Sequence, residues 1–426
     1  MKKNINKIKQ AFFYMLRNNF VSFFLALIVF LVFAKMHPDD SDWFDISFFS
    51  AIILAMGFDV IVKCLSNLIL NWLEDDAKLT SDYSALVRKY KQKVFCYNNA
   101  NASPENIAVL KSLYTKKFND KTATIDQQKL FNFPIEYACN LSNRNIEIID
   151  SDTPYTLPDE VKDRFDEIIA AHHTSVIFNQ LNVRVDDWTQ ENNVFKIFTS
   201  RTTYFNSMVT NRAMDYKWSN GLSVRELYAY GPFFPALKES NLSNHLGFNG
   251  FVESSDGYIV FVKRGKNLSI GKGTYANSVG ASLKAKYALN EDKIFNEEGL
   301  KLAMQKEIKD ELKIQPDDLV SFSLEKNVIA AYRDMVEGGK PQLLFYAKSK
   351  LNKQTIEQNF NKGRKATNSK LSPLLEDGNQ LLWIKRDELP SLCITPEMMI
   401  YRQKAYKMVP SASACVAMLI NHLIGE

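Results

Sequence analysis

The chain has 426 residues, enough for two or three domains with buried cores. Its formal net charge of +5 is too small to indicate a nucleic-acid-binding groove by itself, and no nucleic-acid polymer is expected as a partner. The five cysteines show no C-x-x-C spacing, which is typical of a reducing compartment and argues against a disulfide framework or a zinc site.

Two apolar stretches open the chain. Residues 18–34 hold no charged side chain, and their length is close to the minimum that crosses a bilayer as a helix. The second stretch, residues 46–73, is interrupted by Asp59 and Lys63, which lie four residues apart and can pair on one helix face. Alternatively, the lysine reaches along the helix to the membrane interface. We expect residues 1–75 to form a two-helix transmembrane hairpin.

The charges around this hairpin predict its orientation. Five Lys and Arg residues precede the first stretch, whereas the connecting loop, residues 35–45, holds one lysine against four aspartates. Because Lys and Arg accumulate on the cytoplasmic side of a membrane, we predict a two-pass protein with its N- and C-termini in the cytoplasm.

Residues 76–150 show a polar, helical pattern, and we predict a helical connector there. Their basic segment, residues 81–97, could lie against anionic lipid at the inner membrane surface, or could be a solvated helix. The acidic, proline-containing stretch 150–158 is the predicted boundary with the next part of the chain.

Residues 151–247 are expected to form an α+β segment packed on the domain that follows. Their arginines, with an aromatic ring and an amide, suit a site for phosphate and base, because guanidinium groups bind phosphate in a fork and aromatic faces stack on bases. Alternatively, Arg–Asp pairs and capping residues hold an irregular segment together. The predicted ligand-binding residues are Arg201, Tyr204, Asn211 and Arg212.

Residues 302–314, LAMQKEIKDELKI, predict an amphipathic helix, since apolar residues recur every four positions from Met304. Glu307, Asp310 and Glu311 are spaced so that their carboxylates share one sector of that helix. Three hard oxygen ligands in such an arrangement suit Mg²⁺ or Mn²⁺. The alternative is a solvated face whose acids are neutralised by neighbouring lysines.

This helix resembles the second half of the Nudix box, G-x5-E-x7-R-E-U-x-E-E-x-G-U, where U is aliphatic. Further features follow the order of a Nudix domain: residues 256–264 (DGYIVFVKR) resemble the strand that ends in basic residues, and residues 278–282 (SVGAS) the glycine turn that opens the box. Residues 380–389 resemble the late strand and the "W…DEL" element after it. The resemblance implies a Nudix-like α/β/α domain over residues 248–426.

The box departs from the family pattern. The acid expected six residues after Gly280 is Lys286, the box Arg is Lys306 and the box Gly is Lys313. In Nudix hydrolases the box glutamates bind divalent ions that polarise a diphosphate and its attacking water. The three acids of the helix keep those positions, so Mg²⁺ is the implied cofactor if a metal binds. A degenerate box is typical of a domain that binds nucleotides without turnover, and we assign no catalytic residue.

Two membrane helices, a linker and a Nudix-like domain resemble the membrane-anchored Nudix effectors of CBASS, the bacterial cyclic-oligonucleotide-based anti-phage signalling systems. The resemblance also rests on residues 210–215 (TNRAMD) and 243–251 (SNHLGFNGF). It implies a protein of the bacterial inner membrane whose soluble domain binds a cyclic oligonucleotide made by a CD-NTase. Binding would drive homo-oligomerisation of the hairpins, membrane disruption and abortive infection, because a ligand that prefers the assembled state shifts the population toward it.

A second hypothesis comes from another functional class. The chain would then be a membrane-anchored, Mg²⁺-dependent Nudix hydrolase of a nucleoside diphosphate derivative or of the cyclic nucleotide. A constitutive scaffold would neither bind nor hydrolyse a ligand. All three share the predicted α+β fold class, with the transmembrane hairpin, the helical connector and the C-terminal Nudix-like domain.

Overall fold

The computed structural model describes residues 75–118, 130–173, 178–265, 271–367 and 378–425. These residues form a mixed α/β structure that contains three β-sheets. Residues 77–168 and 176–426 make up one structural unit, and all three sheets lie in it.

The largest sheet is mixed. Its neighbouring strands are antiparallel except for one parallel pair at its centre, β11 with β6. Two short strands, β8 and β9, pair with β7 and β6. In spatial order the main strands are β1 (Val94–Asn98), β2 (Leu130–Asn140), β10 (Val328–Asp334), β11 (Lys340–Lys348), β6 (Gly247–Glu253), β7 (Tyr258–Arg264) and β12 (Gly378–Lys385), and the short ones are β8 (Tyr275–Ala276) and β9 (Val279–Ser282).

The central strands of this sheet are buried on both faces. Every residue of β10 is buried, as are the first eight of β11. Because side chains alternate along a strand, Leu344 and Tyr346 belong to one hydrophobic core while Leu343 and Phe345 belong to another. The sheet therefore lies between two cores, and its central strands carry near-continuous apolar sequence.

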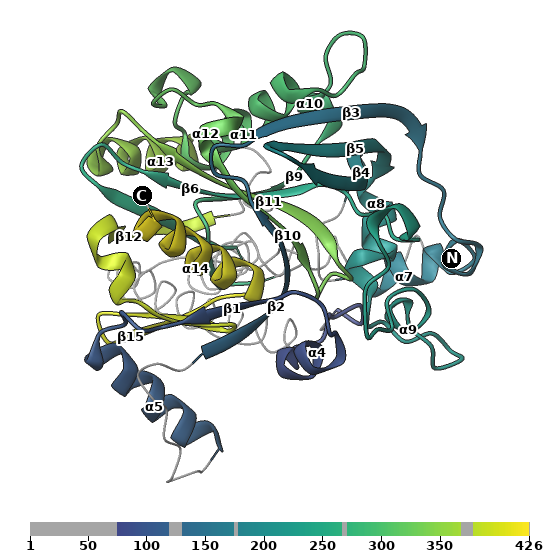
Figure 1. Ribbon diagram of the computed structural model, residues 1–426, viewed down its shortest axis with the longest axis horizontal. Helices are drawn as coiled ribbons and strands as arrows, with labels where there is room; N and C mark the ends of the chain where they lie inside the picture. The colour runs from purple at the N-terminus through teal and green to yellow at the C-terminus, as the bar shows by residue number, and fades with distance from the viewer. Residues whose placement is uncertain (1–74, 119–129, 174–177, 266–270, 368–377, 426) are drawn as a thin grey trace, which may run out of the picture. The chain divides into compact units, whose positions relative to one another are not determined.

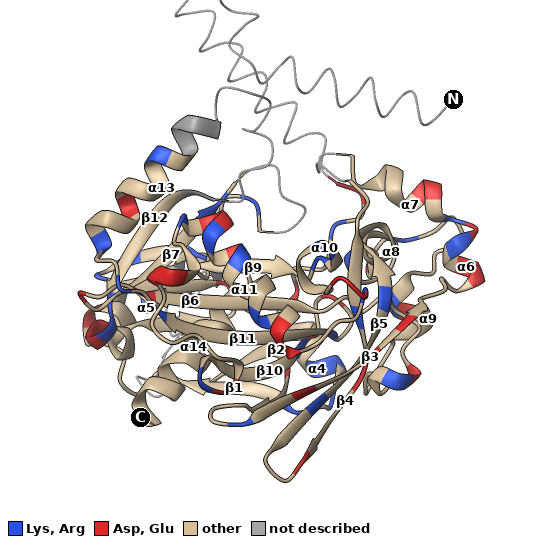
Figure 2. Ribbon diagram, turned by 90° about the horizontal axis from the view of Figure 1, so that it is seen from above, with Lys and Arg blue, Asp and Glu red and all other residues tan. Residues whose placement is uncertain are grey.

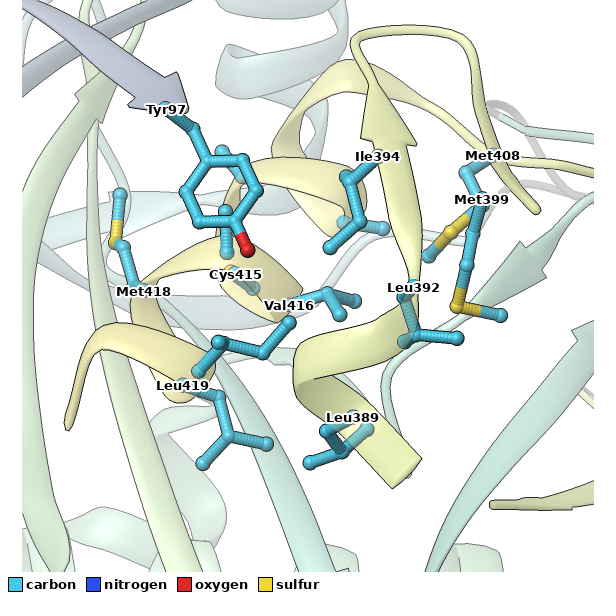
Figure 3. Close-up of a cluster of buried hydrophobic side chains, with 14 of the residues drawn as sticks. Tyr97, Leu389, Leu392, Ile394, Met399, Met408, Cys415, Val416, Met418 and Leu419 are labelled. Carbon is cyan, nitrogen blue, oxygen red and sulfur yellow. The ribbon is translucent and has the colours of Figure 1, made fainter. Parts of the chain in front are cut away.

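The first core lies under α14 (Pro410–Gly425), which contacts β2 and β10 (Figure 1). In Figure 3, Val416 and Leu419 of this helix point toward Leu389, Leu392 and Ile394. Other elements of this core are α5 (Pro104–Phe118), the 3₁₀ segment η5 (Arg386–Ser391) and a small antiparallel sheet of β13 (Cys393–Thr395), β14 (Met398–Tyr401) and β15 (Lys404–Lys407).

The second core lies under α11 (Glu297–Leu312) and a three-stranded sheet in the order β3-β5-β4. In this sheet β3 (Asn145–Pro154) is parallel to β5 (Val194–Thr203), and β4 (Leu181–Glu191) is antiparallel to β5. The remaining elements are α4 (Tyr83–Lys89), α6 (Asp159–Lys162), α7 (Phe165–Ala171), α8 (Tyr204–Val209), η1 (Asn211–Ala213), α9 (Val224–Tyr228), η2 (Leu237–Glu239), α10 (Ala285–Ala288), η3 (Pro316–Asp318), α12 (Leu324–Asn327) and α13 (Lys353–Thr367).

The predicted helix over residues 302–314 is confirmed as α11. Asn296 caps its first turn by accepting a hydrogen bond from the backbone N–H of Gly299, and Lys313 ends it in the left-handed conformation. The strands expected in residues 256–264 and 380–384 lie in β7 and β12, whereas most of the predicted glycine turn, residues 278–282, forms strand β9.

The predicted fold class, α+β with a transmembrane hairpin and a helical connector, is wrong. Residues 76–150 contain β1, β2 and the beginning of β3 besides two helices, and β2 pairs with β10, far along the sequence. Alternating burial of Phe131, Phe133 and Ile135 is the two-residue period of a strand, which the helical interpretation overlooked. The predicted boundary at residues 150–158 begins inside β3.

The predicted hairpin, residues 1–75, lies outside the described residues except for Asp75. Among the helices that the structure describes, none combines the length and the apolar character needed to cross a membrane.

Two substitutions on α14 test the first core. Leu419 is fully buried, so Leu419→Ala should lower the free energy of unfolding by about 2–5 kcal/mol through lost burial and a residual cavity. Ile424 on the same helix is 56% exposed, and Ile424→Ala should change it by less than about 0.5 kcal/mol. Urea unfolding measures both, and equal losses would contradict the assigned core.

Candidate functional site

Arg201 on β5 is paired inside the protein. Its Nη1 and Nη2 atoms donate to the two carboxylate oxygens of Asp150 on β3, at 2.7 and 2.6 Å, and both side chains are more than nine-tenths buried. Burial raises the pKa of Asp150, but hydrogen bonds from Arg201, the Phe295 N–H and Thr199 outweigh it, so this pKa lies below its ordinary value. The guanidinium fork expected for phosphate thus joins β5 to β3 in the β3-β5-β4 sheet.

Asn211 and Arg212 meet at one residue, Glu337, in the turn between β10 and β11. The amide of Asn211 donates to the Glu337 carbonyl at 2.9 Å, and its Oδ1 accepts from the Asn244 N–H at 2.9 Å. The Nε of Arg212 lies 3.0 Å from the Glu337 carboxylate. Asn211 is fully buried. Both predicted ligand residues therefore hold a turn of the large sheet.

Tyr204 begins α8 and is half-buried. Its ring lies 6.4 Å from the ring of His245 and 6.5 Å from that of Phe178, close to parallel with both. His245 is fully buried, and burial holds the pKa of its imidazole well below the ordinary value, so it is neutral. Of the four predicted ligand residues, the structure thus brings Asn211 and Arg212 together and pairs Arg201 elsewhere.

The turn between β10 and β11 holds a buried cluster of charges. The Lys340 ammonium lies 3.3 Å from the Glu337 carboxylate. Burial and the charge of Glu337 raise the pKa of Asp334 to about 7, whereas burial lowers the pKa of Lys340 to about 8. The pKa of Glu337 is lowered, because Arg212 and Lys340 outweigh the opposite effect of burial. Proton uptake at this turn is therefore linked to folding.

The predicted metal ligands on α11 lie among lysines (Figure 2). Glu307 is 4% exposed, and one of its carboxylate oxygens accepts from the Lys284 ammonium at 2.6 Å. Asp310 accepts from Lys306 at 2.5 Å. Glu311 accepts from the Gly280 N–H at 3.4 Å, in the region of the predicted glycine turn.

Lys306 and Lys286 stand where the predicted resemblance to a Nudix box would place Arg and an acid. Together with Lys284 they surround one ring, that of Tyr287, with ammonium-to-centroid distances of 5.4, 4.6 and 5.3 Å for Lys284, Lys286 and Lys306. Within the described ranges, no group of three or more His, Cys, Asp or Glu side chains is placed to hold a metal ion. The expected Mg²⁺ site stays a prediction.

A pocket of about 660 Å³ lies elsewhere in the unit, beside β2, β10 and the β4–β5 hairpin. Burial lowers the pKa of Arg333, which lines it, while the charges of Glu136 and Asp187 oppose that shift. No pattern in the sequence indicated this pocket. Its residues come from separate segments, and only Lys91, Gln92 and Lys93 belong to a segment that the sequence marks, the basic stretch 81–97. The residues that line it include Lys91, Gln92, Lys93, Glu136, Tyr137, Asp187, Trp188, Phe195, Phe233 and Arg333.

Comparisons with known proteins give little further information. No protein-family model matches the chain, and no curated protein matches it. Among solved structures, the chain is similar to DR0079 from Deinococcus radiodurans, with 16% identity over 34% of this chain and 69% of that chain and a TM-score of 0.19. At that TM-score the similarity supports no inference about fold or function.

A double-mutant cycle tests the structural role of Arg201. Arg201→Met leaves Asp150 buried without its partner, which should cost about 3–5 kcal/mol of stability, whereas the double variant with Asp150→Asn should lose clearly less. The matched control is Lys196→Met, since Lys196 on β5 pairs with the exposed Glu191 on β4 and should contribute at most about 1 kcal/mol. Additive losses in the cycle would show that the buried pair contributes no coupling.

The pH dependence of stability tests the buried turn. The pKa of Asp334 is about 7 in the folded protein against an ordinary value of 3.8, so folding takes up a proton between these pH values. The free energy of unfolding should therefore fall as pH rises through this window, by at most about 1.4 kcal/mol per pH unit.

Asp334→Asn removes this titration and should flatten the pH dependence between pH 4 and about 7. The exposed Asp317 provides the control, and Asp317→Asn should leave the slope unchanged. Urea unfolding across this range measures both variants. An unaltered slope in Asp334→Asn would refute the buried, protonated carboxyl.

Proposed function

We propose that this domain binds a nucleotide ligand without hydrolysing it, as the sensor of a signalling system. The observation that supports sensing over hydrolysis is the pairing of the α11 carboxylates with lysines. Glu307 is held by Lys284 at 2.6 Å and Asp310 by Lys306 at 2.5 Å. Carboxylates that bind a divalent ion must face it together, and ammonium groups at those positions repel a cation.

The pairing is strongest at Glu307. Burial alone would lower the pKa of Lys284, but the charge and the hydrogen bond of Glu307 raise it above its ordinary value. Lys284 is therefore charged at neutral pH, and its ammonium is paired with the Glu307 carboxylate. A metal ion that replaced Lys284 would have to leave that ammonium partly buried without its partner, which is costly.

The ligand we propose is a cyclic oligonucleotide made by a CD-NTase, on the strength of the resemblance to CBASS effectors. A ligand that binds one arrangement of chains more tightly than another shifts the population toward it by its difference in affinity. Oligomerisation on ligand binding is the proposed response. The predicted output, disruption of the bacterial inner membrane in abortive infection, depends on residues 1–74, which lie outside the described residues, and it stays a prediction.

The test compares ligand binding with turnover in the full-length protein. Wild type should be stabilised against heat by at least one cyclic di- or trinucleotide, by about 3 kcal/mol at a ligand concentration near 100 times Kd, with or without Mg²⁺. No hydrolysis of that ligand or of nucleoside diphosphate derivatives should be detected with Mg²⁺ or Mn²⁺.

The variant Glu307→Gln/Glu311→Gln provides the contrast. Loss of the pair with Lys284 should lower its own unfolding temperature. Relative to that lower value it should keep the ligand-induced stabilisation, because these carboxylates do not contact the ligand in a sensor. A hydrolase would instead show metal-dependent product formation in wild type and lose it in this variant, and that result would overturn the proposal.

A further inference from the structure

The pocket beside β2 and β10 has the size of a small-molecule site. Its volume of about 660 Å³ lies in the range of about 300–1,000 Å³ that is usual for such sites. β2 and β10 form its wall in the large sheet, the β4–β5 hairpin provides a second wall, and residues 233–237 contribute a third. All of these elements belong to one structural unit.

Aromatic side chains line one side of the pocket. The rings of Trp188 on β4 and Phe195 on β5 pack together, with centroids 5.6 Å apart. Phe195 is only 2% exposed, so the half-buried Trp188 is the ring of this pair that a ligand can contact. A bulge in β4, between Val185 and Asp187, directly precedes Trp188, and such bulges often redirect side chains at functional sites. Phe233 is 58% exposed and also lines the pocket. Flat rings of this kind stack on the faces of nucleobases.

Two residues that line the pocket, Arg333 and Gln92, carry buried polar atoms. Arg333 is only 5% exposed; its Nε donates to the Gly339 carbonyl at 2.9 Å, and its Nη1 lies 3.3 Å from the Glu136 carboxylate. Its Nη2, like the Oε1 of Gln92, is buried without a hydrogen-bond partner among the described residues. One is a donor and the other an acceptor, and a buried polar group without a partner is costly. A ligand could pair with these atoms only if the two side chains turned toward the pocket.

The charges indicate how such a ligand is oriented. Lys91 and Lys93 are exposed where they line the pocket, whereas Glu136 and Asp187 keep an anion away from Arg333. Phosphate therefore suits the lysines at the edge, as a point charge against ammonium groups. The inner part, with a donor, acceptors and aromatic faces, suits the mixed edge of a purine, whose ring nitrogens and keto group accept while its amino group donates.

We propose that this pocket is a purine nucleotide site, with the base beside Trp188 and Arg333 and the phosphate at Lys91 and Lys93. The inference deepens the proposed function and rests on it, since it says where the sensed nucleotide binds. A base held there contacts both the large sheet and the β4–β5 hairpin.

Tryptophan fluorescence of the full-length protein tests the site directly. AMP, GMP, cyclic di-AMP and cyclic di-GMP are titrated as probes, with inorganic phosphate as the probe that lacks a base. At least one purine nucleotide should quench the fluorescence, and phosphate should not. Trp188→Phe should remove the quenching but keep the affinity, because it keeps an aromatic face. Trp188→Ala should weaken binding, measured by calorimetry, by about tenfold or more.

Trp383 on β12 provides the matched control, because it is also half-buried and does not line this pocket. Trp383→Phe should keep both the quenching and the affinity. Lys91→Glu/Lys93→Glu should weaken nucleotide binding and reduce its salt dependence, since it reverses the charge expected at the phosphate. Thermal unfolding without ligand checks that each variant is folded.

The outcomes separate this inference from the proposed function. If wild type binds no nucleotide by calorimetry, the proposed function fails and the site fails with it. If wild type binds a nucleotide and folded Trp188→Ala binds it equally well, the site alone is overturned. If inorganic phosphate competes with the nucleotide at the same concentration, the purine assignment is wrong.

Discussion

The double-sided burial of the β10–β11 hairpin is the constraint on which most of this structure depends. Because both faces of these strands lie in a core, the polar groups of their turn can be satisfied only by the protein itself. Arg225 donates to the carbonyls of Met335 and Val336, at 2.9 and 2.7 Å, while Asn211 and Arg212 hold Glu337. The polar segment around residues 211–225 thus supports the turn, and this role explains its unusual content of arginine and asparagine.

The need to pair buried polar groups within the protein also accounts for the ion pair of Glu307 on α11. A carboxylate as deeply buried as Glu307 needs a cation close by, and Lys284 provides it within the chain. A Nudix-type box would leave such carboxylates for divalent ions, which are strong but removable partners. Lys284 instead neutralises the Glu307 carboxylate from within the chain, without an ion from solution.

The sequence predicted local features better than distant pairings. The four-residue period of α11 and the apolar run of β7 are local signals, and both elements lie where they were expected. β2 was missed because its strand character depends on pairing with β10, nearly two hundred residues away, and Pro134 and Glu136 obscure its alternation. The ligand residues were misjudged for a related reason. Composition shows that Arg201 is present, but not that Asp150 on a neighbouring strand already binds both of its terminal nitrogens.

The arginines show that the sequence alone does not reveal which side chains are free to bind a ligand. Arg201 and Arg225 stand in polar stretches that resemble binding motifs, yet each makes a bidentate pair with an aspartate of its own chain. Arg333 lies in an apolar strand, VIAAYRD, and no sequence pattern marks it as a binding residue. It is nevertheless an arginine that lines the pocket, and its Nη2 atom is buried without a hydrogen bond to any described residue. A side chain can bind a ligand only with the donors that are not already hydrogen-bonded within the folded protein. Which donors these are depends on residues that are far apart in the sequence.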